Sequence, residues 1–173
     1  MSPPQNPAGA FVPEDNYGPA RREEFIAVIA NAPAALHKAV AGLSNEQLDT
    51  RYKNWTIRQI VHHLPDSHVN SYIRFKWALT EEQPTIKAYY EDRWAALADS
   101  RTGDLQAPLA LLEALHARWV QLLRVMSDED YSRSFIHPQT GETLSLCATL
   151  CYYAWHCRHH TAQITWLREQ NGW

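Results

Sequence analysis

Cysteine is scarce in this sequence, which has 3 cysteines among 173 residues. An odd number does not suit a framework of disulfide bonds. Cys147, Cys151 and Cys157 all fall within one predicted helix, where we expect them to pack as small apolar side chains. The cysteines therefore argue against a disulfide-stapled domain and favour a reducing compartment.

The sequence also lacks long apolar runs and an excess of positive charge. No segment reaches the length of a membrane span, and the first residues have neither the basic nor the apolar stretch of a secretory signal. The 16 basic residues are scattered among 19 acidic ones, and the formal net charge is -3, so a nucleic-acid partner is not expected. We expect a cytoplasmic protein that binds a small molecule and neither nucleic acid nor a membrane.

The chain has the length of one domain preceded by a proline-rich segment. The prolines of this segment are Pro3, Pro4, Pro7, Pro13 and Pro19. Because proline fixes its backbone and has no N–H to donate, we expect residues 1–19 to form an extended arm that crosses the surface or docks on a neighbour. Residues 20–173 are then a single folded domain.

Apolar residues recur at helical spacing in four long stretches, at residues 20–41, 56–79, 108–126 and 145–170. Pro33 is expected to kink the first helix, and Thr56 with Gln59 forms a capping box at the start of the second. A short helix is expected at 91–98, and turn residues favour a small hairpin within 135–146. This pattern predicts an all-α fold, a four-helix bundle with short extra helices.

Histidines gather in two of the predicted helices. His62 and His63 lie in the second, and His156, His159 and His160 lie in the last. Residues four apart share one face of a helix, so His156 and His160 can bind a single ion. One more imidazole from a facing helix would leave a position open for water or substrate, as in catalytic metal sites.

Polar rows beside the apolar stripes identify the face of each helix that would line a pocket. In the second helix this row is Gln59, His63, Ser67, Asn70 and Arg74. In the last helix it is Tyr153, His156, His160 and Gln163. His62 lies about 100° around the helix from His63, so we expect His63 to face the pocket and to be the third metal ligand.

Other polar residues have simpler interpretations. Three histidines are expected to be surface or hydrogen-bonded core residues, namely His37, His68 and His137. His116 lies on an apolar stripe and is a further candidate for the pocket lining. Cys157 diverges from its neighbour His156 and is expected to be a packed residue rather than a ligand. Arg74 is either a solvated charge or the partner of a substrate carboxylate.

Residues 54–64 (NWTIRQIVHHL), together with residues 66–68 and 153–160, resemble the signature of the DinB/YfiT-like family. The similarity extends over nearly the whole chain. It implies a four-helix bundle of up-down-down-up topology, a three-histidine site for one divalent metal ion and, commonly, a homodimer. By motif the ligands correspond to His63, His156 and His160. Pro65 departs from the pattern, because the family has a helix former there, and we expect it to kink the helix beside His63.

The resemblance also suggests activities. The YfiT branch is described as metal-dependent hydrolases, and the related BstA proteins as bacillithiol S-transferases. We therefore expect a metal-dependent S-transferase that activates a thiolate, or alternatively a hydrolase that activates water, or else a non-catalytic metal-binding module. Zinc is the expected ion and nickel is also suited. Arg74, Asn70, Ser67 and Tyr153 are the residues expected to hold a thiol such as bacillithiol or the substrate.

Overall fold

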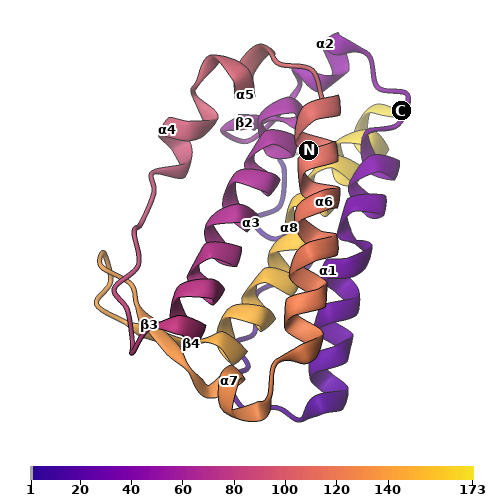
Figure 1. Cartoon of the computed structure of the whole chain (residues 1–173). Helices are drawn as coiled ribbons and strands as arrows, with labels where there is room; N and C mark the ends of the chain where they lie inside the picture. The colour runs from indigo at the N-terminus through magenta and orange to yellow at the C-terminus, as the bar shows by residue number, and fades with distance from the viewer. Residues whose placement is uncertain (1) are drawn as a thin grey trace.

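The computed structural model describes residues 2–173, and four long helices dominate it. They are α1 (Pro19–Val40), α3 (Ile57–Thr80), α6 (Gln106–Val125) and α8 (Leu146–Asn171). Helix α1 packs on α6 and α8, and α3 packs on the same two helices from the other side. The segment between α3 and α6 crosses back along the outside, so these two helices run in the same direction (Figure 1). The predicted four-helix bundle with up-down-down-up topology is confirmed.

Short helices connect the long ones. They are α2 (Asn45–Leu48), α4 (Glu91–Ala95), α5 (Ala98–Thr102) and α7 (Asp128–Ser132). The single short helix expected at 91–98 is instead divided into α4 and α5, and α7 was not predicted. Within residues 2–173, no helix combines the length and the apolarity needed to cross a membrane.

Two small antiparallel hairpins complete the fold. Strands β3 (Ser134–Ile136) and β4 (Thr143–Ser145) form the predicted one, and β1 (Arg51–Tyr52) with β2 (Trp55–Thr56) forms one that was not predicted. An isolated two-stranded hairpin is marginal. The linker after α3 stabilises β3, because Ile86 N–H donates to the carbonyl of Ile136 at 3.0 Å.

The start of α3 is set by a capping box. The Gln59 backbone N–H donates to Thr56 Oγ1 at 3.1 Å, and the Thr56 N–H donates to Gln59 Oε1 at 2.9 Å. These bonds pair two of the backbone donors that a helix start leaves free. The phase of α3, and with it the face on which His63 lies, is therefore determined close to the histidine pair.

The long helices continue through their internal prolines. Helix α1 remains unbroken at Pro33, and α3 at Pro65, in contrast to the sharp interruption that proline often causes. Each proline still leaves the carbonyl four residues earlier without its helical N–H partner. For Pro33 that carbonyl belongs to Ile29, and it accepts a hydrogen bond from His116 Nδ1 at 2.6 Å instead.

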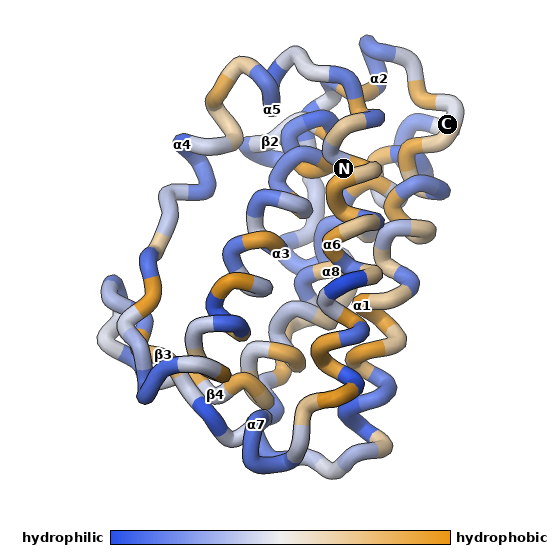
Figure 2. Tube along the Cα trace, viewed as in Figure 1, coloured by the Kyte–Doolittle hydropathy of each residue, from blue (hydrophilic) through white to orange (hydrophobic). Residues whose placement is uncertain are grey.

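The core consists of two apolar clusters stacked along the bundle. One is built around Phe75, Trp119 and Leu146, and the other around Leu36, Ile57 and Ile164. Figure 2 shows apolar segments alternating with polar ones along each long helix, as expected for amphipathic helices that bury one face. Each large apolar side chain in these clusters contributes about 1.5–3 kcal/mol by burial.

The N-terminal arm, residues 2–18, contains no helix or strand and contacts α8. Trp155 Nε1–H donates to the carbonyl of Gly9 at 2.9 Å, and Tyr17 OH donates to that of Cys147 at 2.6 Å. The ring of Phe11 packs edge-on against Tyr152, with centroids 5.3 Å apart. Cys147, like Cys151 and Cys157, is buried and free, as the sequence predicted.

Candidate metal centre

His63 on α3 and His156 with His160 on α8 come together inside the bundle. The Nε2 atoms of His63 and His156 lie 3.3 Å apart. The ring of His160 has its centroid 4.8 Å from that of His63 and 4.4 Å from that of His156. One nitrogen of each ring lies within 4.8 Å of the other two. The structure thus brings together the three side chains that the sequence predicted as a metal-ligand set.

This donor set fits a divalent ion such as zinc. Two nitrogens bound tetrahedrally at about 2.0–2.1 Å from one zinc would lie about 3.3–3.4 Å apart, which matches the separation of His63 and His156. Burial, together with the neighbouring rings, holds the pKa of His63 and of His156 well below the usual value. Burial likewise lowers the pKa of His160 to about 4. All three imidazoles are therefore neutral near pH 7, which is the form that binds metal.

The neighbouring His62 points to a different part of the fold. Its Nε2–H donates to the carbonyl of Asp104, 3.1 Å away in the connection between α5 and α6. The roughly 100° rotation per helical residue thus separates His62 from His63, as expected.

Hydrogen bonds from α8 itself orient His160. Its Nδ1–H donates to Gln163 Oε1 at 2.9 Å, and the Gln163 amide N–H donates to His159 Nε2 at 2.9 Å. A proton on Nδ1 leaves the lone pair of His160 Nε2 free for a metal ion. Such outer partners set the tautomer and the ring orientation of ligating histidines.

The three histidines form one wall of a pocket of about 800 Å³. Ser67, Arg74 and Tyr153, which the sequence placed on the polar rows, line the same pocket. Asn70 does not, because its amide turns back along α3 and donates to the carbonyl of Asp66 at 2.7 Å. The structure therefore brings Ser67, Arg74 and Tyr153 to the pocket of the three histidines and leaves Asn70 outside its lining.

Residues outside the four long helices complete the pocket, and the sequence did not single them out for it. The arm contributes Phe11 and Glu14, and the segment after β3 contributes His137. Tyr89 comes from the linker before α4. No helical periodicity exists in these segments, so no sequence signal connects them with the histidines.

Buried nitrogens without a hydrogen-bond partner belong to residues that line the pocket. Arg74 Nε and His137 Nδ1 are buried atoms without a hydrogen-bond partner. Burial and the nearby Arg74 charge lower the pKa of His137. His137 lines the pocket, whereas it was expected to be a surface or hydrogen-bonded core residue. The Arg74 guanidinium is suited to an anionic group of a ligand.

The two remaining buried histidines lie behind the pocket. His68 is fully buried and hydrogen-bonded, which agrees with its interpretation as a core residue. His116 is buried beside it at 1 % exposure and does not line the pocket of the metal-ligand histidines, contrary to its candidacy.

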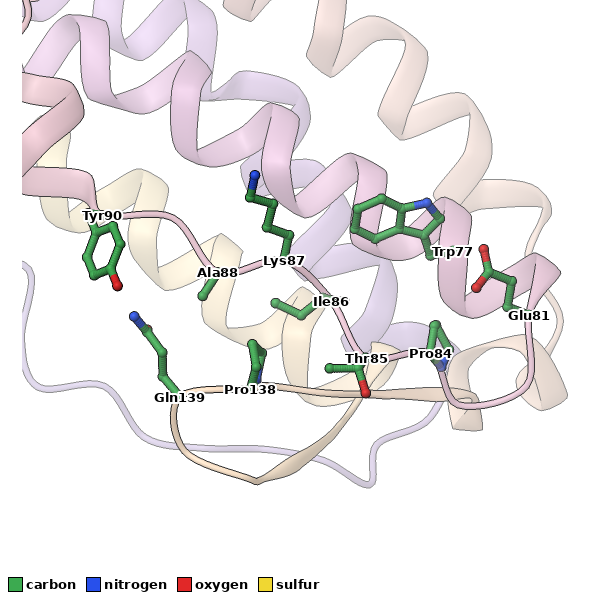
Figure 3. A pocket seen from close by; sticks show the side chains of 10 residues that line it. All are labelled: Trp77, Glu81, Pro84, Thr85, Ile86, Lys87, Ala88, Tyr90, Pro138 and Gln139. Carbon is green, nitrogen blue, oxygen red and sulfur yellow. The ribbon is translucent and has the colours of Figure 1, made fainter.

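Another pocket, of about 500 Å³, lies between the linker after α3 and the 134–145 hairpin (Figure 3). Its lining includes Trp77, Ile86 and Pro138, and the side chains of Tyr90 and Gln139 point toward each other at one end. The lining holds no histidine or cysteine. The pocket with the three histidines is thus the stronger candidate for chemistry.

Residues 29–164 match the family model of the DinB superfamily, and the chain belongs to this superfamily of helical bundles. It is 46% identical to YfiT of Bacillus subtilis over 169 residues, which cover 96% of this chain and 95% of the relative. A protein of Bacillus cereus (strain 03BB102) is 52% identical over 153 residues, 87% of each chain. Both relatives carry names that assign them provisionally as metal-dependent hydrolases.

Solved structures agree with the membership of this chain in the DinB superfamily. YfiT from Bacillus subtilis superposes with a TM-score of 0.94 over 97% of both chains and is described as having an unusual four-helix bundle topology. The mycothiol-dependent maleylpyruvate isomerase matches with a TM-score of 0.62 at 19% identity, over 79% of this chain and 57% of its own. At that identity the likeness extends to the fold alone.

Proposed function

We propose that this protein is a metal-dependent enzyme in which His63, His156 and His160 bind one divalent ion at the wall of the large pocket. The observation that carries the proposal is the convergence of three buried, neutral imidazoles beside open space. Three protein ligands leave a position for a reactant, whereas structural zinc sites are closed by four. We expect zinc in this position, and nickel is also suited to imidazole ligands.

The reaction favoured by the donor set is S-transfer from a thiol. A divalent ion with three neutral ligands keeps its full charge and lowers the pKa of a thiol or water bound to it. A thiol, with an ordinary pKa of about 8.5, needs much less assistance than water at about 15.7.

The pocket wall favours an acidic thiol such as bacillithiol. Arg74 lines the pocket, its buried Nε has no hydrogen-bond partner, and a planar guanidinium can hold a carboxylate through two bonds. Ser67 and Tyr153 lie between Arg74 and the histidines along the polar rows, with Tyr153 OH donating to the carbonyl of Ser67 at 3.3 Å. These residues would position the thiol, while the rest of the pocket holds the small-molecule electrophile.

Hydrolysis is the second candidate, and the names of the relatives favour it. The same position would then hold water, and Arg74 would bind a carboxylate of the substrate.

The resemblance also leads us to propose a homodimer in solution, which sedimentation equilibrium measures directly.

The decisive assay compares zinc-loaded and chelator-treated protein. Conjugation of monochlorobimane is measured with bacillithiol and with a neutral thiol, and cleavage of ester and amide substrates is measured in parallel. We expect metal-dependent conjugation that is faster with bacillithiol. Metal-dependent cleavage without conjugation would establish the hydrolase instead, and neither activity in protein shown to bind zinc would favour a metal-binding module.

A further inference from the structure

A chain of hydrogen bonds leads from the ligand His156 through the interior of the bundle. His156 Nδ1 and His68 Nε2 lie 3.0 Å apart, and His68 Nδ1 and His116 Nε2 lie 2.6 Å apart. His116 Nδ1 then reaches the carbonyl of Ile29 at 2.6 Å. The four residues belong to α8, α3, α6 and α1 in turn, so the chain joins all four long helices.

The Ile29 carbonyl at the end of the hydrogen-bond chain determines which ring nitrogen of each histidine is protonated. A carbonyl oxygen can only accept, so His116 must donate from Nδ1. A neutral imidazole has one N–H, so His116 Nε2 accepts from His68 Nδ1–H, and His68 Nε2 accepts from His156 Nδ1–H. The remaining lone pair of His156 is then on Nε2, which is the atom 3.3 Å from His63 Nε2.

The sequence explains why this carbonyl is available. In a regular helix the carbonyl of Ile29 would accept the N–H of residue 33, but that residue is Pro33 and has no N–H. A buried carbonyl without a partner is costly, so His116 meets a need that the proline creates. The final acceptor of the hydrogen-bond chain is therefore provided by Pro33, which leaves the Ile29 carbonyl of α1 free.

We propose that His68 and His116 are positioning residues that hold His156 in the tautomer required for metal binding. This inference rests on the proposed metal site, because it assigns the two histidines a role toward that ion. Outer partners of ligating histidines usually are carboxylates, carbonyls or waters. Here the imidazoles of His68 and His116 link the Ile29 carbonyl of α1 to the ligand His156 of α8. This link fixes the orientation of the His156 ring.

A separate metal site explains the same residues less well. One nitrogen each of His68 and His116 lies within 4.8 Å of the Cys157 sulfur, so this trio is a second potential ligand group. However, the 2.6 Å between the two nitrogens is a hydrogen-bond distance and is shorter than the roughly 3.3–3.4 Å expected between tetrahedral zinc ligands. Burial also raises the pKa of the Cys157 thiol to about 12, which disfavours the thiolate that a metal would require.

The first test examines the parent protein without metal. Long-range ¹H–¹⁵N correlation spectra of the imidazoles distinguish protonated from unprotonated ring nitrogens. We expect the proton of His156 on Nδ1 and an unprotonated Nε2, with the same arrangement in His116 and His68. A proton on His156 Nε2 in the folded metal-free protein would overturn the inference and leave the proposed metal site untouched.

The second test measures zinc affinity by competition with a chromophoric chelator. His68→Leu removes the acceptor for His156, and we expect affinity to fall by about 10–100-fold, the usual effect of losing an outer partner. His68→Gln offers an amide oxygen in place of Nε2 and should recover part of this loss. Cys157→Ala is the matched control, because it alters packing beside the same rings and removes no member of the chain.

The outcomes separate the two proposals. If the parent protein binds no zinc, the proposed function fails before the variants are compared. If the parent binds one zinc and His68→Leu binds it as tightly as Cys157→Ala does, the positioning role is wrong. Loss of a second equivalent of zinc in Cys157→Ala would show that the trio is a metal site instead. Circular dichroism establishes that each variant is folded. His116→Gln repeats the comparison of zinc affinity at the next member of the hydrogen-bond chain.

Discussion

The imidazoles of the metal-ligand group carry little charge because the fold buries them. Transfer of a charged group into the interior is unfavourable, so burial favours the neutral form of histidine. The same effect lowers the pKa of His116 to about 4, and the fully buried His68 is shifted in the same direction. A cluster of five histidines can therefore exist in one interior without mutual repulsion near neutral pH.

Acid should weaken the metal-free protein through these residues. Histidines bind protons in the unfolded chain near their ordinary value of 6.5, whereas folded His160 does so only near 4. Since the unfolded state binds more protons between these values, the free energy of unfolding should fall as the pH decreases from about 6.5 to about 4. Urea denaturation in chelator at several pH values measures it. A flat profile across this window would contradict the assigned neutral cluster.

The choice between the adjacent histidines is tested by single substitutions. His63→Ala removes a proposed metal ligand, so zinc affinity should fall by more than the roughly 10–100-fold expected for outer residues. His62→Ala is the matched control, because it removes an adjacent buried imidazole that donates to the carbonyl of Asp104 and does not line the pocket. Metal content by atomic absorption and affinity by chelator competition give the result. Full occupancy in His63→Ala with loss in His62→Ala would reverse the assignment.

Arg74 is expected to recognise the carboxylate of the thiol. Arg74→Lys retains the charge but loses the planar fork, so the apparent affinity for bacillithiol should weaken by about 10-fold, in line with ~1.5 kcal/mol for a charged hydrogen bond. Zinc content and the rate with a neutral thiol should not change. Asn70→Ala serves as control, because Asn70 lies on the same helix but outside the pocket. Unaltered kinetics with bacillithiol in Arg74→Lys would identify Arg74 as a structural charge.

Among the segments outside the long helices, the N-terminal arm contributes to the lining of the pocket. It lies on α8 through backbone carbonyls and the ring of Phe11, while Pro13 and Glu14 reach the pocket lining. It contributes little to the two apolar clusters of the bundle, to which Phe11 and Tyr17 add at the edge. The arm therefore borders the pocket as well as packing on α8.

Deletion of residues 1–15 should leave a folded bundle that binds zinc. We expect a helical circular dichroism spectrum and unchanged zinc stoichiometry, because the metal-ligand residues lie on α3 and α8. Substrate affinity should decrease, since Phe11 and Glu14 no longer border the pocket. A truncated protein that is insoluble or has lost its helical signal would show that the arm is needed for folding.

For the whole molecule, metal binding and folding should be coupled. The proposed ligands come from two helices, and the orienting chain of His156 involves all four, so the site exists only in the assembled bundle. A ligand that binds only the folded state stabilises it by about 2.7 kcal/mol at 100 times its dissociation constant.

Zinc removal should therefore lower the thermal midpoint reversibly. We expect the midpoint to fall on treatment with chelator and to recover when zinc is restored, as measured by differential scanning calorimetry. The shift should be smaller in His68→Leu than in the parent at equal zinc concentration. An identical midpoint with and without zinc, in protein that has one bound equivalent, would contradict this coupling.

Helical periodicity alone predicted the four long helices and the relative placement of the candidate histidines. The spacing of apolar residues located the four long helices, and Thr56 with Gln59 located the start of α3. The rotation between adjacent helical residues separated His63 from His62, and the spacing of four placed His156 beside His160. These are local properties of a helix, so the order of residues is enough to determine them.

Contacts between segments that are distant in the sequence could be identified only in the folded structure. His68 and His116 are 48 positions apart, and His116 and Ile29 are 87 apart, so no local pattern links them. Asn70 shares the polar row of His63, yet its amide donates to the carbonyl of Asp66 and the residue does not line the pocket. Side-chain hydrogen bonds depend on which partners packing brings within about 3 Å, and only the assembled bundle determines that distance.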